Sequence, residues 1–142
     1  HPGGKLGRRL LTRVSDLMHS GKALPLVSHN MPMKQVVSIM TSGEVRGVAG
    51  VLSEDKKLIG VITDGDLRRR LEKSQNPLEG NASDIMTLHP KSIASTELAE
   101  KALFLMESHS IQMLFVLDGD QGADKVPIGV IHFHDLLRAN IR

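Results

Sequence analysis

The residues best suited to chemistry lie in the stretch GVITDGDLRRRL, residues 60–71. Its apolar run predicts a strand ending at Thr63, and Asp64 and Asp66 then open a helix. A helix start offers unpaired N–H groups to a phosphate, the Thr63 hydroxyl can donate, and the Asp66 carboxylate suits a ribose diol. Gly60 either lets a group approach the strand closely or avoids a clash. The stretch therefore predicts a nucleotide-binding site.

Helix capping alone explains the same residue types, because an acid at a helix start stabilises the helix by about 1 kcal/mol. Residues 129–140, GVIHFHDLLRAN, repeat the pattern with Asp135 in the place of Asp66. This recurrence favours binding, although duplication also preserves a cap, so both interpretations stay open. His132 replaces Thr63 in the second copy, and an imidazole also donates to a phosphate, more strongly when protonated.

The only dense basic run is Arg68, Arg69 and Arg70. Such a run is typical of the solvated side of a helix and suits its dipole. In a second interpretation, Arg68 or Arg69 reaches a bound phosphate. Because 18 basic residues stand against 16 acidic ones and the three aromatic residues are all Phe, no nucleic acid partner is expected.

Other chemistry finds little support in the sequence. His132 and His134 would share one face of a strand and could bind a metal, but no further ligand set accompanies them, so no metal site is predicted. No nucleophile–base pair or G-x-S-x-G elbow occurs, so no catalysis by this chain is expected. There is no cysteine, no secretory signal and no apolar run of about 20 residues, which indicates a cytoplasmic setting away from the membrane.

These residues sit within an internal repeat. VSDLM at 14–18 resembles ASDIM at 82–86, and GVITDGDL resembles GVIHFHDL 69 residues later. Hydrophobic periodicity predicts a β-α-β-β-α order in each half, after a short helical turn. We expect an α+β fold in which the halves pack about a pseudo-twofold axis, because each half alone is marginal. The predicted parts are a linker at 1–13, a first domain at 14–74, a linker at 75–81 and a second domain at 82–142.

The repeated unit, its SDLM or SDIM lead-in and GVITDGD resemble the cystathionine-β-synthase (CBS) domain family. Two CBS domains usually pair into a Bateman module, which binds adenosine nucleotides or related ligands between its halves. The resemblance implies one site at Gly60, Thr63, Asp64 and Asp66, and a counterpart at His132 and Asp135. The second site departs from the family pattern, which has Thr or Ser where His132 stands.

A longer resemblance runs through HPGGKLGRRLLTRVSDLMHSGKALPLV and TDGDLRRRL, which are similar to the C-terminal half of bacterial arabinose-5-phosphate isomerases. It implies a parent aldose–ketose isomerase whose N-terminal sugar-isomerase domain is absent here. That family interconverts ribulose 5-phosphate and arabinose 5-phosphate on the route to Kdo for lipopolysaccharide or capsule. His1 matches the histidine of the family's HPGG linker, which is associated with the isomerase active site.

The expected function is therefore regulatory. The CBS pair would sense AMP or ATP, with the pathway product CMP-Kdo as the second choice, and would bias the isomerase domain. We expect CBS pairs to dimerise and the full-length protein to be a tetramer. In the alternative, the module only holds subunits together and has no physiological ligand.

Overall fold

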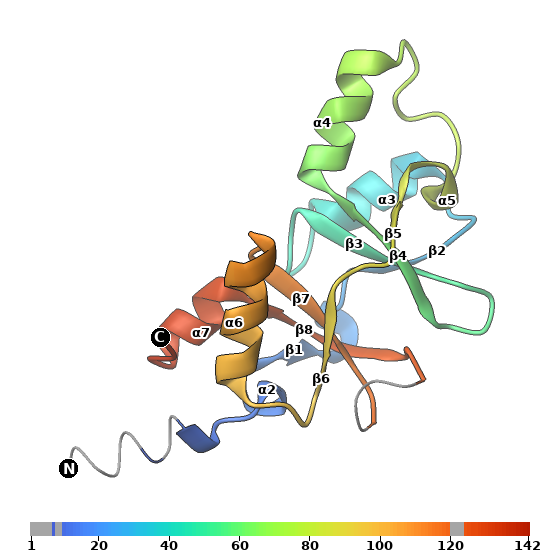
Figure 1. Cartoon of the computed structure of the whole chain (residues 1–142). Coiled ribbons are helices and arrows are strands. Elements are labelled where there is room, and N and C mark those ends of the chain that lie inside the picture. The colour runs from blue at the N-terminus through green and yellow to red at the C-terminus, as the bar shows by residue number, and fades with distance from the viewer. Residues whose placement is uncertain (1–6, 8–9, 120–123) are drawn as a thin grey trace. The chain divides into compact units, whose positions relative to one another are not determined.

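The computed structural model describes residues 7, 10–119 and 124–142, and it contains the same five elements twice (Figure 1). His1 lies outside the described residues. The order confirms the predicted α+β class and the β-α-β-β-α repeat. The first repeat consists of β2 (Leu26–Ser28), α3 (Met33–Met40), β3 (Val48–Leu52), β4 (Leu58–Thr63) and α4 (Asp64–Lys73). The second consists of β6 (Ser92–Ala94), α6 (Ala99–His109), β7 (Met113–Leu117), β8 (Pro127–His132) and α7 (Phe133–Arg138).

The strands of each repeat form the same arrangement. β2 runs parallel to β3, which is antiparallel to β4, and β6, β7 and β8 repeat this pattern. Both antiparallel pairs carry a register shift at the equivalent place, after Val51 and after Val116. Each central hairpin therefore delivers its last strand to the start of a helix, at Thr63 and at His132.

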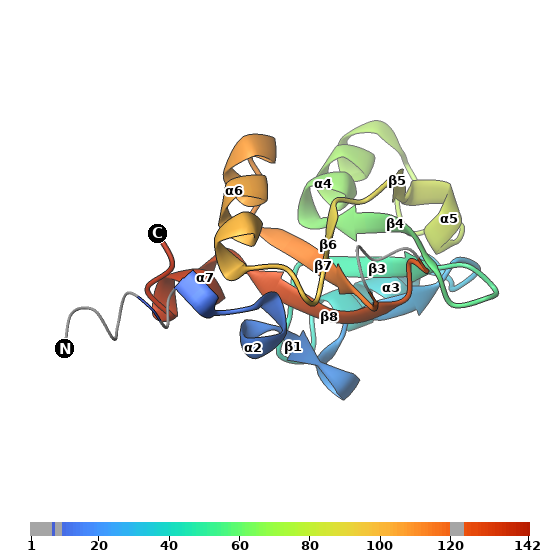
Figure 2. The same cartoon turned by 60° about the horizontal axis from the view of Figure 1, so that its bottom comes forward.

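The segments that lead into each repeat join the sheet of the other repeat. The first comprises α2 (Val14–Leu17) and β1 (His19–Ser20), followed by a 3-10 turn, η1 (Gly21–Ala23); the second comprises α5 (Ala82–Ile85) and β5 (Thr87–Leu88). β1 pairs antiparallel with β8, beside which it lies in Figure 2, and β5 pairs antiparallel with β4. Among the described residues, the compact units are consequently Ala23–Pro90 and a unit made of the residues up to Lys22 with those from Lys91 to Arg142, which differ from the boundaries of the sequence repeats.

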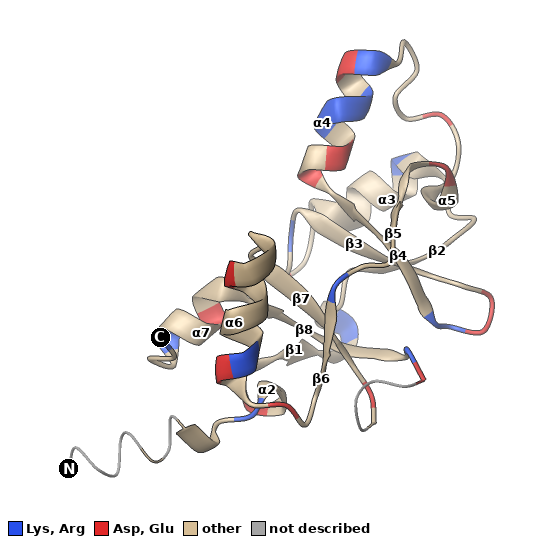
Figure 3. Ribbon diagram, viewed as in Figure 1, with Lys and Arg blue, Asp and Glu red and all other residues tan. Residues whose placement is uncertain are grey.

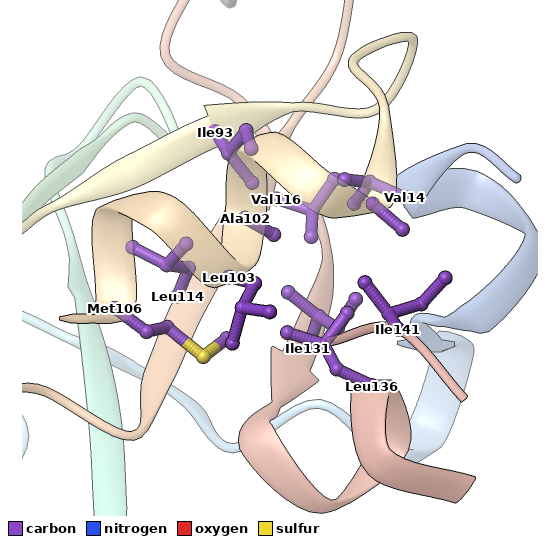
Figure 4. Close-up of a cluster of buried hydrophobic side chains, with 11 residues drawn as sticks. Val14, Ile93, Ala102, Leu103, Met106, Leu114, Val116, Ile131, Leu136 and Ile141 are labelled. Atoms are coloured by element: carbon purple, nitrogen blue, oxygen red, sulfur yellow. The ribbon is translucent and has the colours of Figure 1, made fainter. Parts of the chain in front are cut away.

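Each unit has its own apolar core, and part of that core comes from the lead-in segment that joins it from the other repeat, called the exchanged segment below. The fully buried Val14 of α2 packs among the side chains drawn in Figure 4, which come otherwise from the second repeat. Ala82 of α5, at the equivalent repeat position, is fully buried in the core of the first repeat. Burial of these two residues anchors the exchange, because apolar surface removed from water stabilises the fold in proportion to its area.

Helix α4 differs from the core helices. It buries no side chain fully, whereas α3 buries Met33, Val36 and Met40. Its first turn carries Asp64 and Asp66 and its last turn Arg70 and Lys73, an order that suits the helix dipole, although Figure 3 shows a further acidic residue near the C-terminal end. In the described part of the chain, no helix has the length and apolar character needed to cross a membrane.

Candidate functional site: two acid clusters

The first predicted acid lies in a capping box at the start of α4. The Asp66 Oδ2 atom accepts hydrogen bonds from the Thr63 backbone N–H (2.9 Å) and from the Thr63 hydroxyl (3.1 Å). The Asp66 N–H in turn lies 3.3 Å from Thr63 Oγ1. A capping box satisfies two helix-start donors at once, so Asp66 caps α4.

The other carboxylate oxygen of Asp66 faces two further groups. Arg69 Nη2 donates to Oδ1 at 2.7 Å, and the Thr87 hydroxyl of β5 donates to it at 3.3 Å. Thr63, Asp66, Arg69 and Thr87 are called the first acid cluster. The Asp66 side chain is 11% exposed, while that of Arg69 is 62% exposed. Because the guanidinium is mostly exposed, it can turn toward solvent or toward an anion at no cost in lost burial.

The second cluster has the same plan with different side chains. Asp135 Oδ2 accepts from the His132 backbone N–H at 2.8 Å, and Oδ1 accepts from Arg138 Nη2 at 2.8 Å. His19 of β1 takes the place of Thr87, and its Nε2 lies 3.0 and 3.1 Å from the two carboxylate oxygens. His132, Asp135, Arg138 and His19 are called the second acid cluster.

The surroundings shift two pKa values in the second cluster. Burial raises the pKa of Asp135, but the hydrogen bonds from the His132 N–H, His19 and Arg138 outweigh burial and hold it below 3.8. Burial and the neighbouring His134 lower the pKa of His132 below 6.5. Its Nδ1 accepts a hydrogen bond from the His134 N–H at 3.0 Å, which requires this nitrogen to be unprotonated. A neutral His132 and an ionised Asp135 are thus the states that fit the geometry.

Gly60 provides a close approach, and the approaching group is a methionine of the exchanged segment. A methyl group at Gly60 would lie 2.5 Å from Met86 Sδ, and one at Gly129 would lie 2.5 Å from Met18 Sδ. Each methionine lies between the helix and the strand of its lead-in segment, one residue before Thr87 or His19. The two glycines therefore allow the segments to reach the acids.

The remaining predicted residues lie around the first cluster in different ways. Asp64 is exposed, and its N–H donates to the Gly47 carbonyl at 3.1 Å. Arg68 is exposed, whereas Arg69 contacts Asp66 directly. Arg70, which was not predicted as functional, binds the carbonyls of the 75–81 linker, from its Nε to Pro77 (2.8 Å) and from its Nη2 to Glu79 (2.9 Å).

The expectation that His132 and His134 share one face of a strand is wrong. β8 ends at His132, and His134 already lies in α7, where the two rings stack with centroids 4.7 Å apart. The strand ends because Asp135 and the His132 ring complete the helix cap. Among the described residues, no group of three or more His, Asp or Glu is arranged to hold a metal ion.

Sequence reasoning missed His19, Thr87 and Arg138. The signal for the first two was present, because the repeat alignment places both directly after a lead-in methionine. Their contacts with the acids depend on which sheet the lead-in segment joins, and the alignment does not give that.

The two repeats agree with comparisons to known proteins. The sequence model of the CBS domain matches residues 14–73 and 82–142. The chain belongs to the CBS domain family. The arabinose 5-phosphate isomerase KdsD of Pseudomonas aeruginosa is 42% identical over 141 residues, covering 99% of this chain and 42% of the relative. KdsD of Escherichia coli K12 is 36% identical over 141 residues, which cover 99% of this chain and 41% of that relative. The chain thus spans about two-fifths of the length of these curated relatives.

Solved structures support the CBS-pair fold. A CBS domain protein from Pyrobaculum aerophilum complexed with AMP has a TM-score of 0.74 and 21% identity, covering 87% of this chain and 89% of that one. A CBS domain pair complexed with 5′-methylthioadenosine and S-adenosyl-L-methionine has a TM-score of 0.73 and 21% identity, covering 90% and 94%.

Proposed function

We propose that this CBS pair is the regulatory part of an arabinose-5-phosphate isomerase and that it senses a nucleotide. The single observation carrying the proposal is the first acid cluster, where a hydroxyl, an acid and a largely exposed arginine meet at a helix start. The similarity to KdsD over 99% of the chain supports the parent enzyme. In this proposal the parent interconverts ribulose 5-phosphate and arabinose 5-phosphate in Kdo biosynthesis, for lipopolysaccharide or capsule.

The chemistry of the cluster favours a ribose and a phosphate. Asp66 would exchange its bond with the Thr87 hydroxyl for bonds from a ribose diol, and Arg69 would turn from the acid to the phosphate. The AMP bound to the Pyrobaculum aerophilum protein makes an adenosine nucleotide, AMP or ATP, the first choice. CMP-Kdo is the second choice, because a pathway product would provide feedback.

The proposed regulation requires partners. The CBS pair would act on its own N-terminal sugar-isomerase domain through residues 1–13, where His1 would contribute to the complete enzyme's active site. CBS pairs would dimerise, giving a cytoplasmic tetramer of the full-length protein. A ligand alters the isomerase only if it binds more tightly to one arrangement of the assembly than to another.

A structural module without a ligand is the second candidate, and one observation favours it. Each carboxylate oxygen of Asp66 and Asp135 already accepts at least one hydrogen bond from this chain. Such engaged carboxylates are explained by capping and segment docking alone. A ligand must compete with these contacts, so binding has to be measured.

Thermal unfolding with AMP, ATP and CMP-Kdo distinguishes the two candidates. A ligand at a hundredfold excess over its Kd stabilises the folded state by about 2.7 kcal/mol. We expect Asp66→Ala to abolish this stabilisation. Asp84→Ala is the matched control, because Asp84 closes a capping box in the same unit, accepting from the Asn81 N–H at 2.8 Å, but belongs to neither acid cluster. If none of the three nucleotides stabilises the chain, the structural candidate is correct.

A further inference from the structure

The two acid clusters share a backbone plan, and three equivalent positions in or beside them carry an imidazole only in the second repeat. Thr63 corresponds to His132 at the helix cap, Gly65 to His134 in the first turn, and Thr87 to His19 in the exchanged segment. Each small or hydroxyl residue of the first cluster is replaced by an imidazole in the second. The acid and the arginine are retained, so the difference lies in what surrounds the carboxylate.

The first-turn position places different groups beside the two helix caps. At Gly65 the nearest atoms to a built methyl group are Arg69 Nη1 at 3.4 Å and the Thr63 hydroxyl at 3.6 Å, both polar and both in the first cluster. At the equivalent place, the His134 ring lies over the His132 ring at an interplanar angle of 18°. The start of α4 therefore presents polar groups, while two stacked rings occupy the start of α7.

The exchanged segment decides how easily the acid is released. The Thr87 hydroxyl is a neutral donor at 3.3 Å from one oxygen, and Thr87 is exposed. His19 Nε2 lies within 3.1 Å of both oxygens of Asp135, and because a carboxylate only accepts, this nitrogen must donate. Hydrogen bonds to ionised groups are stronger when they are short. A diol therefore displaces Thr87 more readily than His19.

We propose that this CBS pair binds a single nucleotide, at the first acid cluster, and that His19 and His134 keep the second cluster closed. The inference rests on the proposed function and specifies its stoichiometry. In this proposal His19 acts as a latch that holds β1 on Asp135, and Asp135 serves only that contact and the helix cap.

Calorimetric titration with AMP tests this assignment. We expect a single AMP per chain. Asp66→Asn should weaken AMP binding at least about tenfold, whereas Asp135→Asn, the matched change in the other repeat, should leave the affinity within about twofold. Thr87→His should also weaken binding about tenfold by introducing the latch into the first cluster. Thermal unfolding of each variant without AMP verifies that it is folded.

The experiment that should open the second site is the double variant His19→Thr, His134→Gly, which puts the residue types of Thr87 and Gly65 at the equivalent positions of the second repeat. We expect it to bind a second AMP. A folded double variant that still binds a single AMP overturns the assignment of His19 and His134. Two AMP molecules on the unmodified chain, or equal losses from Asp66→Asn and Asp135→Asn, overturn the single-site inference while nucleotide sensing stands. If AMP binds neither the unmodified chain nor the double variant, the inference fails and sensing of AMP fails with it.

Discussion

Replacing Gly60 by alanine tests whether the exchanged segment docks as the structure has it. The added methyl group would lie 2.5 Å from Met86 Sδ and 2.9 Å from Met86 Cγ. Ordinary contact between such atoms begins at roughly 3.5 Å, so Met86 must move away from β4. Overpacking of this kind costs about 1–3 kcal/mol, and the stiffer unfolded chain returns about 0.4–1 kcal/mol. We expect Gly60→Ala to lower the free energy of unfolding by about 1–2 kcal/mol.

Urea unfolding measures this change, and Gly65→Ala is its control. Gly65 lies in α4, and a methyl group there would meet its nearest neighbour at 3.4 Å, an ordinary contact. Alanine should therefore raise the free energy of unfolding by about 0.5–1 kcal/mol at this position. In a Met86→Ala background, Gly60→Ala should lose most of its effect. If Gly60→Ala stabilises the chain as Gly65→Ala does, Met86 does not occupy the face of Gly60, and the docking of β5 is wrong.

Two further predictions concern the second cluster and the linker. Because the pKa of His132 is lowered, the unfolded chain binds more protons than the folded chain as the pH falls below 6.5. The free energy of unfolding, measured by urea titration, should therefore be lower at pH 5.5 than at pH 7.5. His132→Thr should reduce this difference between the two pH values. An unchanged difference would show that other groups cause the pH dependence. Arg70→Ala removes both hydrogen bonds to the 75–81 linker and should speed amide hydrogen exchange there, at a cost of about 1–2 kcal/mol. Arg68→Ala, which changes an exposed arginine on the same helix, should have little effect, and equal exchange in the two variants would mean that Arg70 does not hold the linker.

Much of the local structure was predictable because its signals are local. The apolar run 58–63 followed by two acids predicted both the strand and the helix start, and the structure has them as β4 and α4. The duplicated motif likewise predicted a second helix start at Asp135. The H-x-H interpretation failed because it depended on a boundary. Period-two spacing cannot tell where a strand ends and the next helix begins.

The surroundings of the acids were not predictable from local patterns. Thr87 contacts an acid 21 residues away, and His19 contacts one 116 residues away. The strands that bring them there have two residues each, too few for a periodic signal. Their pairing depends on the fit of Met18 and Met86 against glycines in β8 and β4, the strands with which β1 and β5 pair.

The sequence by itself determined the repeated elements, the capped helix starts and the CBS family, because each depends on residue types a few positions apart. Only the tertiary structure decided that each lead-in segment crosses to the other repeat's sheet and supplies the fourth member of its acid cluster. The physical reason is that hydrogen bonds between distant short strands, and the space that a glycine leaves for a methionine, exist only once the chain has folded.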